Sequence, residues 1–98
     1  MEERQEKEMK IEFPLSDIVE EECHVFQALA KVCGKTLSSS IAAKISMKGD
    51  EKAIRSLVTI LLDNAVKYAN EKGRITVTLE KQKNRIYLSV FKYDRIHF

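Results

Sequence analysis

The sequence predicts an α+β fold, a two-layer α/β sandwich in which two main helices cover one face of a mostly antiparallel sheet. Three observations support this prediction. The chain has 98 residues, enough for one domain with a single core. Two stretches, near 17–33 and 50–70, carry apolar residues at helical spacing, and residues 75–80 and 86–91 alternate apolar with polar residues. Elements with one apolar face are buried best against each other.

The first part of the chain is typical of a short strand followed by a helix. Residues 1–9 form a charged leader that shows neither helical nor strand periodicity. We expect a short strand over Lys10–Phe13 to follow it. Ser16 or Asp17 can cap a helix that begins near residue 17, and Gly34 can follow its C-cap. The predicted apolar stripe of this helix contains Ile18, Val25, Phe26, Leu29, Val32 and Cys33.

The pattern between the two helices is weaker. Ile41, Ala43, Ile45 and Met47 alternate with polar or small residues, which predicts one half-buried strand within residues 36–47. After it, Gly49-Asp50 turns the chain and offers a cap for the second helix.

The second helix, near Asp50–Asn70, has the clearest pattern. Gly73 lies just past its end, and two alternating strands then flank the polar connection Lys81–Asn84, which indicates an antiparallel hairpin. The predicted apolar stripe of the helix contains Ile54, Leu57, Val58, Leu61, Ala65 and Tyr68.

Two cysteines, Cys23 and Cys33, lie ten residues apart in the first predicted helix. The rise of a helix over that length is about 15 Å, too far for a mutual disulfide. We therefore expect two reduced, buried thiols.

Composition and charge exclude several classes of protein. No apolar run approaches the ~20 residues of a membrane span, and the first residues lack the apolar core of a signal peptide. We expect a cytoplasmic domain without a membrane segment, whether or not a parent protein is anchored. The net charge of +2 argues against a dedicated nucleic-acid binder. Ten acids and seven bases give −3 over residues 1–50, and five acids and ten bases give +5 over residues 51–98, so an anion would suit the second half.

Three polar residues can share one flank of the second helix. At 100° per residue, Asn64 lies roughly 80° to one side of the predicted stripe, and Lys67 and Tyr68 are its neighbours one turn on. Asp63 points toward solvent. An asparagine oxygen suits magnesium, and a lysine suits the phosphates that complete the shell of the metal. The alternative is that these side chains are only solvated or packed.

The residues Leu-Val-Thr-Ile-Leu-Leu-Asp-Asn-Ala-Val-Lys-Tyr, over 57–68, resemble the N-box of sensor histidine kinase ATP-binding domains. The Gly49-Asp50 pair, the two later strands and the segment Ile11–Val19 extend the resemblance over nearly all of residues 10–92. We therefore divide the chain into a leader over 1–9, a partial histidine kinase-like ATP-binding domain over 10–92, and a tail over 93–98.

The resemblance implies a site, a reaction and partners. Asn64 would be the magnesium ligand, and Lys67 and Tyr68 would lie beside the phosphates of ATP. The fold would be a truncated GHKL-type, or Bergerat-like, sandwich. In this family the domain passes the γ-phosphate of ATP to a histidine on a separate dimerisation and phosphoacceptor domain, and a response regulator is the further partner of the parent protein.

The departures from the family pattern are as informative as the match. Ile60 stands where the N-box usually has another asparagine. The family's Asp-x-Gly-x-Gly loop, lid and second glycine-rich loop are missing, and Asp94 matches the adenine-binding position only loosely. Phosphate cradles of backbone N–H groups need glycine. Because the loops are missing, we expect the truncated chain to be inactive. His24 lacks the acidic residue and proline that follow the family's acceptor, so we assign no catalytic residue.

Two further interpretations stay open. One is a degenerate GHKL-like interaction or dimerisation module without nucleotide binding. The other is an RNA-binding module that uses Lys81, Lys83, Arg85 and Tyr87, although no recognised motif frames these residues. A truncated sandwich leaves a sheet edge and a helix flank uncovered, so we expect the fragment to form homo-oligomers.

Overall fold

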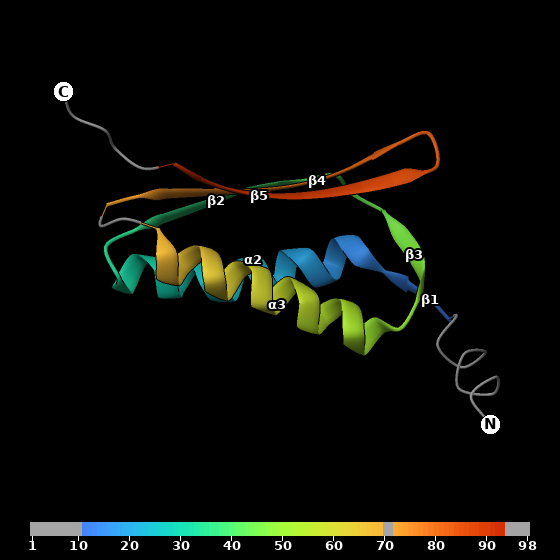
Figure 1. Ribbon diagram of the computed structural model, residues 1–98. Coiled ribbons are helices and arrows are strands. Elements are labelled where there is room, and N and C mark those ends of the chain that lie inside the picture. The colour runs from blue at the N-terminus through green and yellow to red at the C-terminus, as the bar shows by residue number, and fades with distance from the viewer. Residues whose placement is uncertain (1–10, 70–71, 94–98) are drawn as a thin grey trace.

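The computed structural model describes residues 11–69 and 72–93 (Figure 1). The predicted leader and residues 94–98 of the predicted tail lie outside this range. The elements in chain order are β1 (Ile11–Pro14), α2 (Leu15–Val32), β2 (Thr36–Ile41), β3 (Ser46–Gly49), α3 (Glu51–Tyr68), β4 (Arg74–Gln82) and β5 (Arg85–Tyr93).

The two helices lie side by side and cover one face of the main sheet (Figure 1). This sheet has the strand order β2-β4-β5, with β2 parallel to β4 and β4 antiparallel to β5. Strands β1 and β3 form a separate antiparallel pair at one end of the sandwich. The predicted α+β class and the two-layer arrangement are therefore confirmed.

The core lies between the helix layer and the sheet. Strand β4 alternates as predicted, because Ile75, Val77 and Leu79 are buried toward the helices. Their β5 neighbours Leu88 and Val90 pack against the same core from partly buried positions. The largest fully buried side chains are Ile18, Val19, Val58, Leu62, Ile75, Val77 and Leu79.

The helix ends and the hairpin largely follow the prediction. Asp50 caps α3, because its Oδ1 accepts hydrogen bonds from the backbone N–H groups of Lys52 at 3.1 Å and Ala53 at 3.3 Å. Gly34 follows the C-cap of α2 with φ +76°, a left-handed conformation that glycine adopts without strain. The hairpin turn is shorter than predicted, since Gln82 already pairs with Arg85.

The predicted cap of the first helix is wrong. Helix α2 begins at Leu15, with Pro14 in the cap position and no side-chain cap. Ser16 is buried instead, and its hydroxyl donates to the carbonyl of Ala42 at 2.7 Å and accepts from the N–H of Ile45 at 2.8 Å. The hydroxyl of Ser16 thus holds the connection between β2 and β3 in place through these two hydrogen bonds.

The predicted single strand within residues 36–47 is also wrong. The chain leaves β2 after Ile41, turns, and begins β3 at Ser46 in order to pair with β1. Lys44 has φ +64° in this turn, and Ile45 is buried in the core. The alternation of apolar residues from Ile41 to Met47 therefore does not mark one strand, because it runs through the turn that Ser16 holds in place.

Both predicted helix stripes point partly to the wrong side, because they omit buried residues: Val19, Cys23 and Ala30 on α2, and Leu62 and Val66 on α3. Each helix buries only the side that faces the sheet and the other helix, so several predicted core residues are exposed. These are Val25, Leu29 and Val32 on α2, and Leu57, Leu61 and Tyr68 on α3.

The two cysteines differ in environment. Both are free, as expected, but only Cys23 is buried; Cys33 is exposed at the end of α2, so its predicted burial is wrong. Burial, with smaller contributions from Glu22 and Glu20, raises the pKa of the Cys23 thiol to about 11. The folded chain therefore keeps this thiol protonated where an unfolded chain would ionise it.

We predict that Ser16→Ala lowers the free energy of unfolding by about 1–3 kcal/mol, because it leaves the N–H of Ile45 buried without its partner. Urea denaturation measures the change. The matched control is Ser40→Ala at an exposed position of β2, for which we expect a change within about 0.5 kcal/mol. Equal effects of the two substitutions would contradict the role of the Ser16 hydroxyl.

We predict that the Cys23 thiol makes the fold less stable in alkali. As pH rises from the ordinary pKa of the thiol, 9.0, toward the folded value of about 11, only the unfolded chain ionises, so the free energy of unfolding falls. Cys23→Ala should remove this part of the pH dependence in urea denaturation, whereas Cys33→Ala should retain it. The prediction fails if both variants follow the same pH profile as the original chain.

Candidate functional site

The site residues predicted from the sequence lie on one exposed flank of α3. Asn64, Lys67 and Tyr68 are all exposed, in the second half of that helix. On the opposite side of α3, Arg55 and Thr59 contact the carboxylates of α2. The flank with Asn64 therefore faces away from α2.

Strand β5 approaches this flank at Tyr68, at the C-terminal end of α3. The ammonium of Lys92 stands 5.9 Å from the centroid of the Tyr68 ring, a cation–π distance. Lys92 was not among the predicted site residues. The hairpin pattern predicts that β5 exists, but it does not predict which helix the strand crosses. This contact adds a second cation beside the predicted site.

Lys67 is not a free cation. Its ammonium lies 3.0 Å from Oδ2 of Asp63, one turn earlier on α3. A hydrogen bond to that carboxylate and its charge raise the pKa of Lys67, so the amine stays protonated. Asp63 is half-exposed, in agreement with its predicted direction, and it holds the lysine toward the solvent side of the helix.

The amide of Asn64 fits a magnesium ligand in its chemistry and exposure. Among the residues that the structure describes, this side chain makes no hydrogen bond, so its oxygen is available. The described part of the chain holds no group of three or more His, Cys, Asp and Glu side chains that could bind a metal. A magnesium ion bound by Asn64 would complete its shell with phosphate oxygens and water.

If nucleotide binds at this flank, the α3 side chains would form one wall of the site. Ile60, at the departure from the N-box pattern, is 56% exposed on the same side of α3. Asp94, the loose match to the adenine-binding position, lies outside the described residues. Gly34 and Gly49 stand beside helix ends, where they serve the turns of the fold. The side chains on this flank thus have the chemistry that contacts to a metal and to phosphates require.

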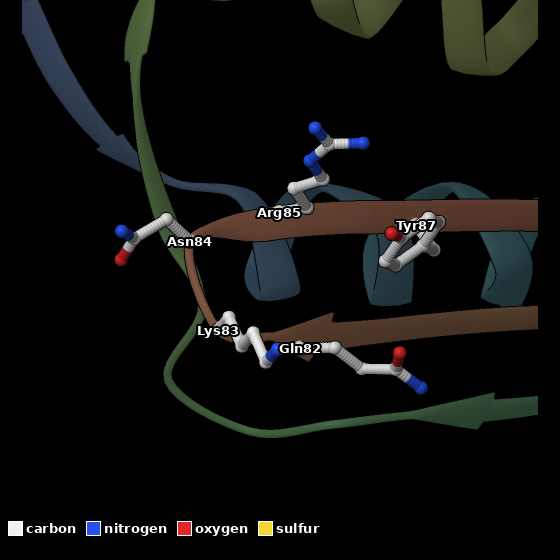
Figure 2. Close-up of a pocket in the computed structure, with 5 residues that line it drawn as sticks. All are labelled: Gln82, Lys83, Asn84, Arg85 and Tyr87. Carbon is white, nitrogen blue, oxygen red and sulfur yellow. The ribbon is translucent and has the colours of Figure 1, made fainter.

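A second candidate site lies at the tip of the β4–β5 hairpin (Figure 2). A hollow there is lined by Gln82, Lys83, Asn84, Arg85 and Tyr87. Figure 2 shows that the side chains of Lys83 and Arg85 extend away from one another. The two cations therefore do not converge on one phosphate, and the arrangement gives the RNA-binding interpretation no support beyond its charge.

Sequence comparisons show that the second half of the chain is similar to a known family. Residues 49–93 match the family described as histidine kinase-, DNA gyrase B-, and HSP90-like ATPase. Sensor protein DltS of Streptococcus agalactiae serotype III (strain NEM316) is 28% identical over 95 residues, which cover 94% of this chain and 24% of that protein. The chain thus spans about a quarter of the length of the curated relatives that it matches.

Solved structures show the same fold. The catalytic domain of histidine kinase ThkA, in a nucleotide-free form, superposes with a TM-score of 0.79 at 20% identity over 88% of this chain and 59% of that chain. The cytoplasmic segment of histidine kinase QseC gives a TM-score of 0.68 at 28% identity over 72% of this chain and 45% of that chain. The predicted resemblance to the ATP-binding domains of sensor histidine kinases is confirmed.

A membrane segment is not found in the described residues, where neither helix has the length and apolar character to cross a bilayer.

We predict that Asp63→Asn lowers the pKa of Lys67 toward its ordinary value, because the raising hydrogen bond and charge both come from Asp63. Titration of the lysine side-chain resonances by NMR measures this shift. Glu51→Gln, which changes an acid near Arg55 at the other end of α3, is the control and should leave the pKa of Lys67 unchanged. An unchanged pKa in Asp63→Asn would show that the ion pair is absent in solution.

Proposed function

We propose that this chain is the N-terminal part of the ATP-binding catalytic domain of a two-component sensor histidine kinase. Its α3 flank would supply the N-box contacts to magnesium and ATP. The observation that carries the proposal is the amide of Asn64, which is exposed and makes no hydrogen bond to the described residues, within the matched residues 49–93. The fold similarity to histidine kinase catalytic domains supports the same conclusion.

In this proposal each residue has a defined task. The oxygen of Asn64 holds the metal, and the ring of Tyr68 lines the space beside the phosphates. Lys67 turns from Asp63 toward a phosphate, which repels that carboxylate and attracts the ammonium. Lys92, over the ring of Tyr68, adds positive charge. Bound ATP supplies the phosphoryl group for histidine autophosphorylation in the parent protein.

We further propose that the 98-residue chain binds the nucleotide weakly and does not catalyse phosphorylation by itself. The contacts lie on an exposed helix flank, where water screens the attraction between lysine and phosphate. The sequence also lacks the glycine-rich loops that close over ATP in the family. Binding energy from one wall of a site is small compared with that of an enclosed site.

The partners proposed for the parent protein follow from the same kinship. Histidine kinase ThkA, which shares this fold at a TM-score of 0.75 and 20% identity, has been solved in complex with response regulator protein TrrA. We propose that the parent of this chain likewise works with a phosphoacceptor domain and a response regulator, on the cytoplasmic side of a membrane if the parent is anchored.

A second candidate function is an interaction module without nucleotide binding. The observation that favours it is the apolar surface around Asn64, where Leu57 is 49% and Ile60 is 56% exposed. Such a surface is more typical of a protein contact than of a phosphate site. In either case we propose that the fragment self-associates.

We predict that titration with Mg-ATP shifts the amide resonances of Asn64 and Lys67 at millimolar nucleotide, and that chelation of the magnesium removes most of the shift. Asn64→Ala should weaken binding by about tenfold or more, since a contact to a charged group contributes roughly 1.5–3 kcal/mol. The matched control Asn84→Ala, in the exposed hairpin turn, should bind as the original chain does.

A folded protein whose α3 resonances do not respond to millimolar Mg-ATP would contradict the nucleotide proposal and favour the interaction module. Equal weakening by Asn64→Ala and Asn84→Ala would show that the contact is not at α3.

A further inference from the structure

We infer that Glu22, on α2, is a positioning residue for the flank of α3 that carries Asn64. The side chain of Glu22 is only 16% exposed, so it lies largely within the contact between the two helices. Its Oε1 accepts a hydrogen bond from the hydroxyl of Thr59 at 2.8 Å, and its Oε2 accepts one from the guanidinium of Arg55 at 3.3 Å. One carboxylate thus holds α3 at two positions that are one helical turn apart.

The neighbouring carboxylate of Glu21 holds α3 less narrowly. It also accepts a hydrogen bond from Arg55, at 3.1 Å, but its side chain is 64% exposed and that of Arg55 is 40% exposed. Water screens an exposed ion pair, and two long side chains follow each other through small movements of the helices. The bond between Glu22 and Thr59 joins a largely buried carboxylate to a short side chain. It therefore restricts the position of α3 more closely.

The bond to Thr59 restricts rotation of α3 about its own axis. At 100° per residue, Asn64 lies roughly 140° from Thr59 and about 180° from Arg55, on the opposite side of the helix. Side chains reach about 5–6 Å from the axis, so a rotation of about 20° moves their ends by about 2 Å. Hydrophobic burial has no preferred direction and tolerates such a rotation, whereas a hydrogen bond of 2.8 Å does not. The core thus determines which side of α3 is buried, and Glu22 sets the rotation within that range.

A second polar contact holds the last turn of α3. The ammonium of Lys35, which follows α2, donates a hydrogen bond to the carbonyl of Val66. The four-carbon side chain of a lysine is flexible, so this bond can follow the carbonyl through a small rotation. The short side chain of Thr59 cannot follow its partner in the same way. We therefore assign the control of rotation to Glu22 and Thr59.

The rotation of α3 matters for ligand binding, a consequence that rests on the proposed function. Groups that bind a ligand must be held within about 0.5 Å of the productive geometry, and a displacement of about 2 Å removes Asn64 from it. The charge of Glu22 acts in the opposite direction. Loss of a carboxylate by itself favours an anion such as ATP. Weaker binding after neutralisation of Glu22 would therefore come from position and not from charge.

Residual dipolar couplings of the backbone N–H groups test the inference without a nucleotide. Along a helix these couplings vary with the helical period, and the phase of this variation reports rotation about the helix axis. Glu22→Gln leaves one acceptor oxygen for two donors, and Thr59→Val removes the hydroxyl but retains the shape of the side chain. Each variant should shift the phase of α3 relative to α2 by about 10–20°, the angular tolerance of a binding site.

Two controls separate position from stability. Thr59→Ser retains the hydroxyl, and Glu21→Gln removes an equal charge at the next position, so both should retain the phase of the original chain. The couplings of the folded state are measured on folded molecules, so a loss of stability alone does not change the phase.

Titration with Mg-ATP tests the consequence for binding. Glu22→Gln should weaken binding by about threefold to tenfold, the range expected for a residue that acts without contact to the ligand. Glu21→Gln should bind at least as tightly as the original chain. In a chain that already carries Asn64→Ala, Glu22→Gln should weaken binding no further, because Glu22 acts through Asn64.

The two arms distinguish failure of this inference from failure of the proposed function. A less stable Glu22→Gln with an unchanged phase of α3, or equal phase shifts in Glu21→Gln and Glu22→Gln, would overturn the positioning role. Binding of Mg-ATP through Asn64 that Glu22→Gln leaves undiminished would overturn it too, and the proposed function would stand. If the phase shifts as expected but the original chain does not respond to Mg-ATP, the positioning role stands and the nucleotide proposal fails.

Discussion

The packing of α3 beneath the sheet determines the direction of every side chain discussed for function. Val58, Leu62 and Ala65 are buried on the side of α3 that faces the core. Because a helix is rigid, burial of that side turns Asn64 outward, away from α2. Rotation of α3 by one residue would bury the asparagine. The hydrophobic packing of α3 against the core thus sets the direction of Asn64, although Asn64 takes no part in that packing.

Local chemistry explains how much of this could be predicted from the sequence. Asp50 lies just before residues with apolar side chains at helical spacing, and this local signal predicts the start of α3. In β4 apolar residues alternate with polar residues, and this second local signal predicts the hairpin. The position of Asn64 on an exposed flank follows from helical spacing in the same way. The resemblance to the N-box is the reason why we propose magnesium and phosphate as the ligands of that flank.

Long-range contacts account for what the sequence pattern missed. Ser16 has the residue type of a cap, but its hydroxyl bonds a turn 26 residues away. Leu57 and Leu61 match an apolar stripe, and only the placement of α2 shows that this part of the stripe is uncovered. The contact of Lys92 with Tyr68 depends on where β5 crosses α3. None of these pairings has a local signature.

The central claim is that Asn64 holds the metal of a bound nucleotide. Manganese binds similar oxygen ligands and broadens nearby NMR signals, so Mn-ATP added to the labelled chain shows where the metal lies. The account predicts broadening that is centred on the side-chain amide of Asn64 and fades along α3 in both directions. Broadening centred on the acidic residues Glu20–Glu22 of α2, or spread evenly over the surface, would contradict it.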